Sequence, residues 1–206
     1  SRLAVRYDLF NQLTSLGLAS LWRRETLSPL KPGMRILDLG CGTGDLALEA
    51  VRRLKGSGEV VGLDFSEKML FFAEKRYEKT GLNGRHKIRW ALKKAEELPI
   101  ENEPYDLVVS GFVLRNLYQN IDLILKGVYR SLKPGGKISF LDITEPEKKW
   151  VRALWKFYMT TFTALVGKVL FGKDYPMFYL TESAKRFLNA AEFRRKLEET
   201  GFCELR

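Results

Sequence analysis

Five short stretches of the chain are rich in residues that favour strands, several of them nearly continuous in valine, isoleucine and leucine, and stretches with helical spacing of apolar residues separate them. They predict strands at 34–39, 60–64, 87–92, 106–112 and 137–143. Near-continuous apolar strands are typical of a sheet that is covered on both faces. The alternation of strands and helices therefore predicts an α/β fold with a doubly wound, mostly parallel sheet, in which ligands bind beyond the carboxyl ends of the strands.

Local signals predict where several helices begin and end. Apolar residues recur with helical spacing at 46–54 and 121–132. Ser66 is a good N-cap, and Asn189 with Glu192 forms a capping pair for a last helix that ends near Gly201. The Lys-Pro-Gly-Gly run at 133–136 is expected to end one helix and to turn the chain into the fifth strand.

The length of 206 residues fits one domain with one large core. We expect an N-terminal helical cap at 1–30, a cofactor-binding core at 31–145, and lid helices with the start of the last strands at 146–206. The aromatic and basic segment 150–171 predicts a helix or helix pair that forms the lid. A sixth strand is expected to begin at Phe202, and we expect the C-terminus to be truncated, because an unpaired sheet edge is a liability.

Charge and cysteine content narrow the class of protein. The net charge of +10 is compatible with an anionic membrane surface, a nucleic acid or an acidic ligand as partner, and equally with a solvated surface rich in lysine and arginine. No run of about 18 uncharged apolar residues occurs, so no membrane-spanning segment is expected. With only two cysteines, a disulfide framework is not expected and a reducing cytoplasm is favoured.

The strongest chemical signal is the glycine-rich turn at 40–44, Gly-Cys-Gly-Thr-Gly, between the first strand and a helix. Glycines let the backbone bend tightly and approach a ligand. Asp64 ends the next strand, where an acidic group can accept both hydroxyls of a ribose. The G-x-G-x-G spacing differs from the dinucleotide fingerprint. Asp38 and Asp45 give the turn an acidic mouth that suits a sulfonium and an α-amino group better than a pyrophosphate; a dinucleotide enzyme or a purely structural turn is the alternative.

Other catalytic signatures are absent from the sequence. It has no phosphate-binding P-loop motif and no His/Cys cluster with metal-ligand spacing, so no metal is expected. The sole histidine, His86, opens the third strand and is expected at the surface, at the end of the sheet opposite the ligand site. At 110–117 the Asn/Asp-Pro-Pro-aromatic motif of amino-methylating nucleic-acid enzymes is missing, and no nucleic-acid partner is expected.

Motifs along the chain resemble those of one family. The glycine turn resembles that of class I S-adenosylmethionine methyltransferases. Tyr7-Asp8-Leu9, the Phe-Val-Leu-Arg-Asn run at 112–116 and the Tyr-Leu-x-Glu-Ser run at 179–183 are similar to motifs of the ubiquinone/menaquinone biosynthesis C-methyltransferases. The chain departs from that pattern at three positions: Lys94 stands where family members have Asp or Asn, Gly111 where they have Ser, and Val113 where they have Gly.

The resemblance implies a Rossmann-like fold and S-adenosylmethionine as the methyl donor, with S-adenosylhomocysteine as product. It also implies carbon methylation of an isoprenoid quinol precursor of menaquinone or ubiquinone, with another small molecule or RNA as the alternative acceptor. A cytoplasmic location, peripheral contact with the membrane and a homodimer are compatible with this function.

The expected site residues fall into two groups. The catalytic candidates are Arg115 and Asn116, which could stabilise a phenolate by charge and hydrogen bond, and Tyr7, which could close over the ring. The expected cofactor-binding residues are Asp38, Gly40, Cys41, Gly42, Thr43, Gly44, Asp64, Phe65, Met69, Lys94, Ala95, Glu96, Ser110 and Gly111.

Overall fold

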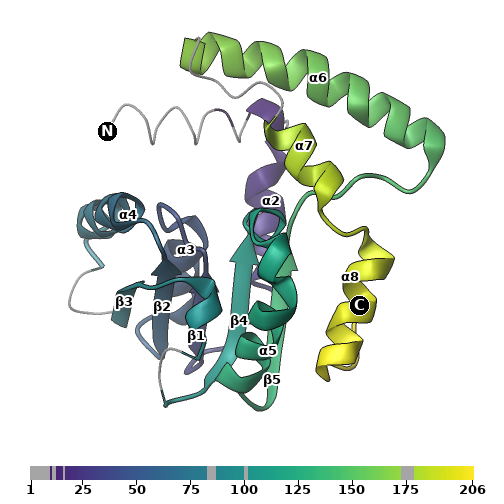
Figure 1. Ribbon diagram of the computed structural model, residues 1–206. Helices are drawn as coiled ribbons and strands as arrows, with labels where there is room; N and C mark the ends of the chain where they lie inside the picture. The colour runs from purple at the N-terminus through teal and green to yellow at the C-terminus, as the bar shows by residue number, and fades with distance from the viewer. Residues whose placement is uncertain (1–9, 11–12, 16, 83–86, 100–101, 173–178) are drawn as a thin grey trace.

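The computed structural model describes residues 10, 13–15, 17–82, 87–99, 102–172 and 179–206. Tyr7 and His86 lie outside this part of the chain. The described strands are β1 (Arg35–Leu39), β2 (Glu59–Asp64), β3 (Lys87–Leu92), β4 (Tyr105–Gly111) and β5 (Leu132–Leu141). They form one sheet in the order β3-β2-β1-β4-β5, and every pairing is parallel (Figure 1). The order reverses between β1 and β4, which is where doubly wound folds bind ligands.

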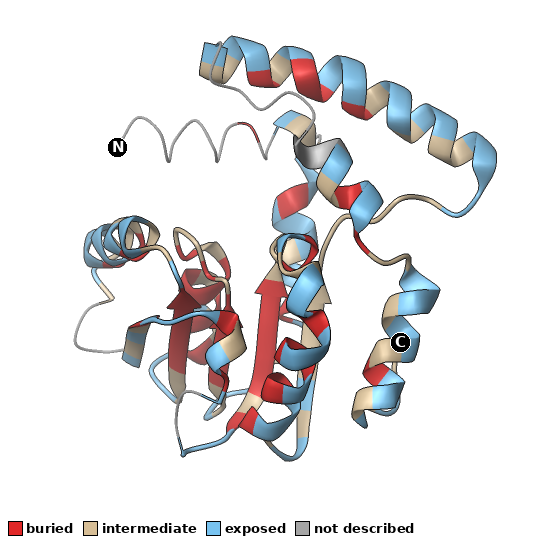
Figure 2. Cartoon of the chain, in the orientation of Figure 1, coloured by how far each residue is buried: buried red, intermediate tan, exposed pale blue. Residues whose placement is uncertain are grey.

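Helices cover both faces of the sheet, as the sequence predicts. They are α2 (Leu18–Thr26), α3 (Asp45–Leu54), α4 (Glu67–Lys79), α5 (Ile121–Ser131), α6 (Lys149–Phe171), α7 (Tyr179–Arg186) and α8 (Ala190–Thr200), with 3-10 turns η1 (Ala95–Glu97), η2 (Leu114–Asn116) and η3 (Tyr118–Asn120). Adjacent residues of β1 point to opposite faces. Ile36 belongs to a core with residues of α3, whereas Leu37 belongs to a core with residues of α5. The central strands are therefore buried on both sides (Figure 2).

The predicted helix caps are confirmed. The Ser66 hydroxyl accepts a hydrogen bond from the backbone N–H of Met69 at 3.4 Å at the start of α4. Asn189 Oδ1 accepts from Glu192 N at 2.9 Å, and Asn189 N donates back to Glu192 Oε2 at 3.0 Å. The last helix ends at Thr200, and Gly201 follows with φ of 110°. Local sequence alone fixes these ends, because each cap satisfies backbone N–H groups of its own first turn.

The fifth strand differs from the prediction at both ends. It begins at Leu132 and ends at Leu141, instead of spanning 137–143. The helix does end just before the run at 133–136, but the run lies within β5, with Gly135 at φ of 74°, because Leu132 already pairs with Tyr105 of β4. The register then shifts, so that the next pair is Leu107 with Lys137, and the additional residues of β5 are accommodated in this irregular stretch.

The predicted sixth strand at the end of the chain was also wrong: the described residues 202–206 form no strand. The carbonyl oxygen of Leu205 accepts a hydrogen bond from Arg194 Nη2 of α8 at 2.8 Å. In a strand, this oxygen would instead accept from the backbone of a neighbouring strand. The ring of Phe202 packs edge-on against Tyr129 of α5, with ring centroids 5.3 Å apart. Both contacts hold the segment against helices.

The segment after β5 forms one long helix, α6, instead of a helix pair. Figure 1 shows α6 and α7 beyond the carboxyl ends of the strands, at the edge where the site is expected. Within the described ranges, no helix is both long and apolar enough to cross a bilayer.

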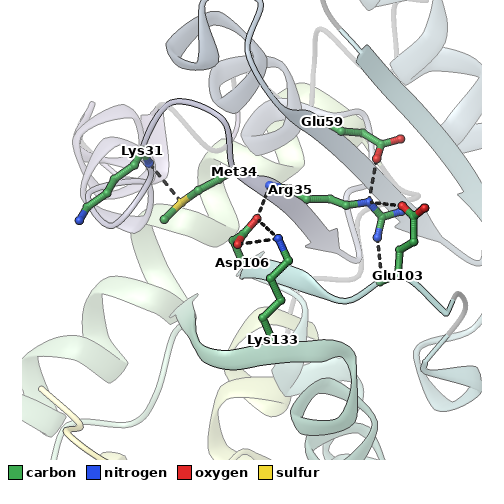
Figure 3. Close-up of polar contacts among 7 residues, drawn as sticks. All are labelled: Lys31, Met34, Arg35, Glu59, Glu103, Asp106 and Lys133. Atoms are coloured by element: carbon green, nitrogen blue, oxygen red, sulfur yellow. Dashed lines mark hydrogen bonds and ion pairs between the residues drawn. The ribbon is translucent and has the colours of Figure 1, made fainter.

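Asp106 of β4 ties three strands together at the opposite edge of the sheet (Figure 3). Its Oδ2 accepts from Arg35 N of β1 at 2.7 Å, and Lys133 Nζ of β5 lies 2.8 Å from its Oδ1. The Arg35 side chain extends the network to β2 through Glu59, 2.7 Å from Nε. Burial raises the pKa of Asp106, but the hydrogen bonds from Arg35 and Lys133 outweigh this and lower the pKa below its usual value.

We expect Asp106→Asn to lower the free energy of unfolding by about 1–2 kcal/mol at pH 7, because charge-assisted hydrogen bonds are lost. A carboxylate with a lowered folded-state pKa stabilises the fold above the unfolded pKa, and this stability is lost as pH falls through the folded pKa. Urea titrations should therefore show the deficit shrinking as the pH falls below the unfolded pKa of about 4. Asp122→Asn, in an exposed ion pair with Lys196, is the control and should cost less than about 0.5 kcal/mol. Equal effects of the two substitutions would contradict this role of Asp106.

Candidate functional site

The glycine turn connects the carboxyl end of β1 to the first residue of α3. Gly40 and Gly42 both adopt left-handed backbone angles, with φ of 69° and 54°. A Cβ at Gly40 would lie only 2.6 Å from Cγ1 of Val113, which follows β4, so the two strand ends meet there. A Cβ at Gly42 would meet nothing within 4 Å. The turn is therefore tightly packed against Val113 at Gly40, whereas there is free space beside Gly42.

Asp64 fixes the open part of the turn. Its Oδ2 accepts from the backbone N–H of Gly42 at 2.8 Å, and its Oδ1 accepts from the backbone N–H of Ser66 at 2.9 Å. The sequence predicts a ribose acceptor here, and each oxygen keeps a lone pair for that purpose. Joining the turn to the start of α4 is an additional role that the sequence did not reveal. The next residue, Phe65, is 71% exposed, and Met69 is half-buried on the first turn of α4.

Asp38 is a buried carboxyl group beneath the turn, only 1% exposed. Its Oδ2 accepts from Ala47 N of α3 at 2.9 Å, whereas Oδ1 has no hydrogen-bond partner within the described residues. Burial raises the pKa of Asp38 to about 7; the Ala47 hydrogen bond lowers it, and the nearby charges of Asp45 and Asp64 raise it further. A buried oxygen without a partner is costly, so Oδ1 marks a place where a donor would be stabilised.

The acidic mouth that the sequence predicts around the turn is only partly present. Asp45 forms ion pairs with Arg23 of α2 and Arg76 of α4, at 2.8 and 2.7 Å. Arg76 also donates from Nη1 to the carbonyl oxygen and the hydroxyl of Thr43, at 3.1 and 2.8 Å. The charge of Asp45 is thus balanced by arginines that sequence spacing did not reveal, and Asp38 and Asp64 carry the negative character of the site.

Other expected cofactor residues have structural partners. The Ser110 hydroxyl is fully buried and donates to the carbonyl oxygen of Leu39 at 2.8 Å, so it joins β4 to β1. A Cβ at Gly111 would lie 2.9 Å from Leu46 of α3, which explains a glycine there. Cys41 is buried, and this burial raises the pKa of its thiol. Ser110 therefore holds two strands together, whereas Gly111 and Cys41 pack closely inside the fold.

The three residues expected near an adenine lie on η1, directly after β3. Lys94 is exposed and precedes the turn, and Ala95 is buried. Glu96 accepts from Asn120 Nδ2 at 2.8 Å, which ties η1 to the start of α5. Backbone groups of this turn lie beside the end of β2, because β2 and β3 are neighbours in the sheet.

Arg115 lies beyond the end of β4 in a buried ion pair with Asp142. Its Nη1 lies 2.6 Å from Asp142 Oδ1, and its backbone N–H donates to Asp142 Oδ2 at 2.9 Å. Nη1 also donates to the carbonyl oxygen of Phe112, a residue with the unusual φ of 62°. Nε donates to the Ser183 hydroxyl of α7 at 3.3 Å, so two motifs distant in sequence meet here. Asn116 is exposed beside them.

The sequence did not identify Asp142, although a signal for it exists. Asp142 directly follows β5, and Asp64 is the last residue of β2 at the same edge of the sheet, so the rule that selected Asp64 applies to Asp142 as well. Within the described ranges, no group of three or more His, Cys, Asp or Glu side chains could hold a metal ion.

Comparison with known proteins places the chain among methyltransferases. The model of the ubiE/COQ5 methyltransferase family matches residues 1–206. A demethylmenaquinone methyltransferase of Lactobacillus johnsonii is 36% identical over 98% of this chain and 82% of its own length. The ubiquinone/menaquinone biosynthesis C-methyltransferase UbiE of Rickettsia prowazekii is 34% identical over 100% of this chain and 83% of its own length.

Solved structures support the fold. A SAM dependent methyltransferase from Aquifex aeolicus superposes with a TM-score of 0.61 at 19% identity, over 87% of this chain and 78% of that one. A cyclopropane synthase from Mycobacterium tuberculosis gives a TM-score of 0.62 at 21% identity, over 93% of this chain and 61% of that one. The predicted Rossmann-like fold of class I methyltransferases is confirmed.

The buried Asp38 predicts a distinct dependence of stability on pH. Because its folded-state pKa lies above that of the unfolded chain, folding takes up a proton between about pH 4 and pH 7, and the stability falls as pH rises through this window. Asp38→Asn should therefore stabilise the ligand-free protein by roughly 1–3 kcal/mol at pH 8 and have little effect at about pH 4. Urea unfolding at both pH values measures this, with Asp106→Asn, whose effect has the opposite sign, as control. Destabilisation at pH 8 by Asp38→Asn would contradict the raised pKa.

Proposed function

The chain belongs to the ubiE/COQ5 methyltransferase family of S-adenosylmethionine-dependent enzymes, and we propose that it methylates a ring carbon of an isoprenoid quinol. The observation that carries this proposal is the Arg115 guanidinium, held at the ligand-binding edge of the sheet by Asp142 and Ser183. The class of the methyl acceptor is inferred from the family and from the names of its members. The role of Arg115 in the reaction is inferred from its contacts at this edge.

The glycine turn and the two acids beside it fit the methyl donor. S-adenosylmethionine supplies a methyl group on a sulfonium and leaves as the neutral thioether S-adenosylhomocysteine. The unpaired Oδ1 of Asp38 can accept from an ammonium group, and its ionised form would be favoured by that cation. The remaining lone pairs of Asp64 can accept ribose hydroxyls, and the open face at Gly42 lets a ligand approach the backbone. The exposed ring of Phe65 is available to stack on a base.

Carbon methylation requires a ring carbon that is made nucleophilic by loss of a hydroxyl proton from the quinol. Arg115 can stabilise the resulting phenolate, since a guanidinium keeps its charge in proteins. Its Nη2 makes no hydrogen bond within the described part of the chain, so this donor is left for a ligand, while Nη1 and Nε hold the group in place. The hydroxyl proton passes to water, the ring carbon bonds to the methyl carbon as the carbon–sulfur bond breaks, and loss of the ring proton restores aromaticity.

The surface beyond the site suits an acceptor with a long apolar tail. One side of α6 exposes Trp150, Leu154, Phe157, Leu165 and Val169, each more than 60% exposed. Their spacing places them along one side of the helix, while Met159, Thr163 and Gly167 on the other side are buried. Lysines 148, 149 and 168 lie exposed at the two ends of the helix. We propose that this apolar stripe contacts an anionic membrane that holds the acceptor.

Methyl transfer tests the acceptor and the role of Arg115 together. Labelled S-adenosylmethionine should transfer its methyl group to demethylmenaquinol and not to bulk RNA. Arg115→Lys keeps the charge but loses the planar fork, and should lower kcat by at least about 100-fold while the Kd for S-adenosylmethionine changes less than about 3-fold. Arg130→Lys on the exposed part of α5 is the matched control and should leave kcat unchanged. Label on RNA alone would overturn the acceptor, and unchanged kcat in Arg115→Lys would overturn the role of Arg115.

Flotation with vesicles tests the membrane contact of α6. The double variant Leu154→Glu, Phe157→Glu places two charges on the apolar stripe and should abolish flotation with phosphatidylglycerol vesicles, because charged groups oppose insertion. The control, Ala153→Glu with Thr160→Glu, makes the same charge change at exposed positions beside the stripe and should retain at least about half of the binding. Equal losses in both variants would indicate a general charge effect and contradict contact through the stripe.

A further inference from the structure

A concave surface behind the glycine turn is unused by the proposed reaction. It lies between α2, α3 and α4 and has a volume of about 370 Å³, within the range of small-ligand sites. Its positively charged lining residues are Arg23, Arg24, Arg52, Arg76 and Lys79. Among the described residues, two acids, Asp45 and Glu49, line the same space. We call this surface the basic groove.

Among its described lining residues, the basic groove has more cations than acids. Arg23 and Arg76 both form ion pairs with Asp45. Glu49 pairs mainly with Arg53, which does not line the groove: its Oε1 lies 2.9 Å from Arg53 Nε. The distance from Glu49 Oε2 to Nη1 of Arg52, which does line the groove, is longer, at 3.8 Å.

Two further cations of the groove, Arg24 and Lys79, form no ion pair within the described residues, and both are exposed. Like charges gathered in a concave site repel one another and raise the local concentration of anions. An anion is therefore the ligand that would stabilise this arrangement.

We infer that the basic groove binds a phosphate-bearing ligand. The arginines of the groove come from α2, α3 and α4. Their guanidinium groups can donate to several phosphate oxygens at once, which favours a phosphate over a single carboxylate as the ligand. The volume admits a phosphate or pyrophosphate group and is too small for a nucleic-acid duplex. Such a group is available either as a free phosphate compound or as a lipid headgroup.

The test removes charges that the glycine turn does not need. Arg23 and Arg76 stay unchanged, because they hold Asp45 and Thr43. The double variant Arg24→Gln, Lys79→Gln removes two charges from the groove. The matched control, Arg130→Gln with Lys126→Gln, removes two exposed charges from α5. Both variants should retain S-adenosylmethionine affinity and methyl transfer, which keeps this test separate from the proposed function.

Two probes distinguish the sources of phosphate. In titration calorimetry, pyrophosphate should bind the unaltered protein, and the groove variant should lose at least about 10-fold in affinity while the control loses less than about 2-fold. In flotation, the groove variant alone should lose binding to phosphatidylglycerol vesicles if the phosphate belongs to a lipid headgroup. A selective loss with either probe supports the inference. Equal effects in both variants with both probes, or a selective loss with a single-stranded oligonucleotide alone, would overturn it.

Discussion

The site depends on one carboxylate, that of Asp64, which binds the backbone N–H groups of Gly42 and Ser66. These two bonds connect the turn after β1 to the start of α4 across the end of β2. They act together with the hydrogen bonds of Arg76 to Thr43 to restrict a turn whose left-handed glycines could otherwise adopt many backbone angles. The same oxygens face the space where a ribose is proposed to lie. One buried acid thus both shapes the turn and offers acceptors to a ligand.

Asp38 and Arg115 represent two different solutions to burying a charge. Arg115 has a counter-ion, Asp142, and the two side chains form a buried ion pair. Such a pair contributes little to stability on balance, because desolvation offsets the attraction, and its value lies in fixing where the guanidinium points. Asp38 has no counter-ion beneath the turn, and its pKa rises to about 7. This difference suits the proposed roles, since Arg115 needs a permanent charge, whereas Asp38 gains its charge partner when a cationic ligand binds.

Much of the fold could be predicted from the sequence, because its signals are local. Strand hydrophobicity, the Ser66 cap and the Asn189–Glu192 pair each act within a few residues, and the structure confirms them. The misjudged features depend on distant partners. The start of β5 at Leu132 is set by pairing with Tyr105, and the segment after Gly201 is held by Arg194 and Tyr129. For the same reason the sequence located Arg115 but not Asp142, and located Asp45 but not the arginines that neutralise it.

The two halves of the site differ in how far apart their parts lie in the sequence, and this has a structural consequence. The half proposed for the methyl donor joins residues 22 positions apart, Gly42 and Asp64, within one strand–helix–strand unit. The half proposed for the acceptor joins Arg115 to Asp142, 27 positions away, and to Ser183, 68 positions away on α7. The contact between Gly42 and Asp64 therefore lies within the β1–α3–β2 unit, whereas the acceptor half also requires the segment after β5 to be in place at the sheet edge. A change in α6 or α7 can thus alter the acceptor half while the donor half stays intact.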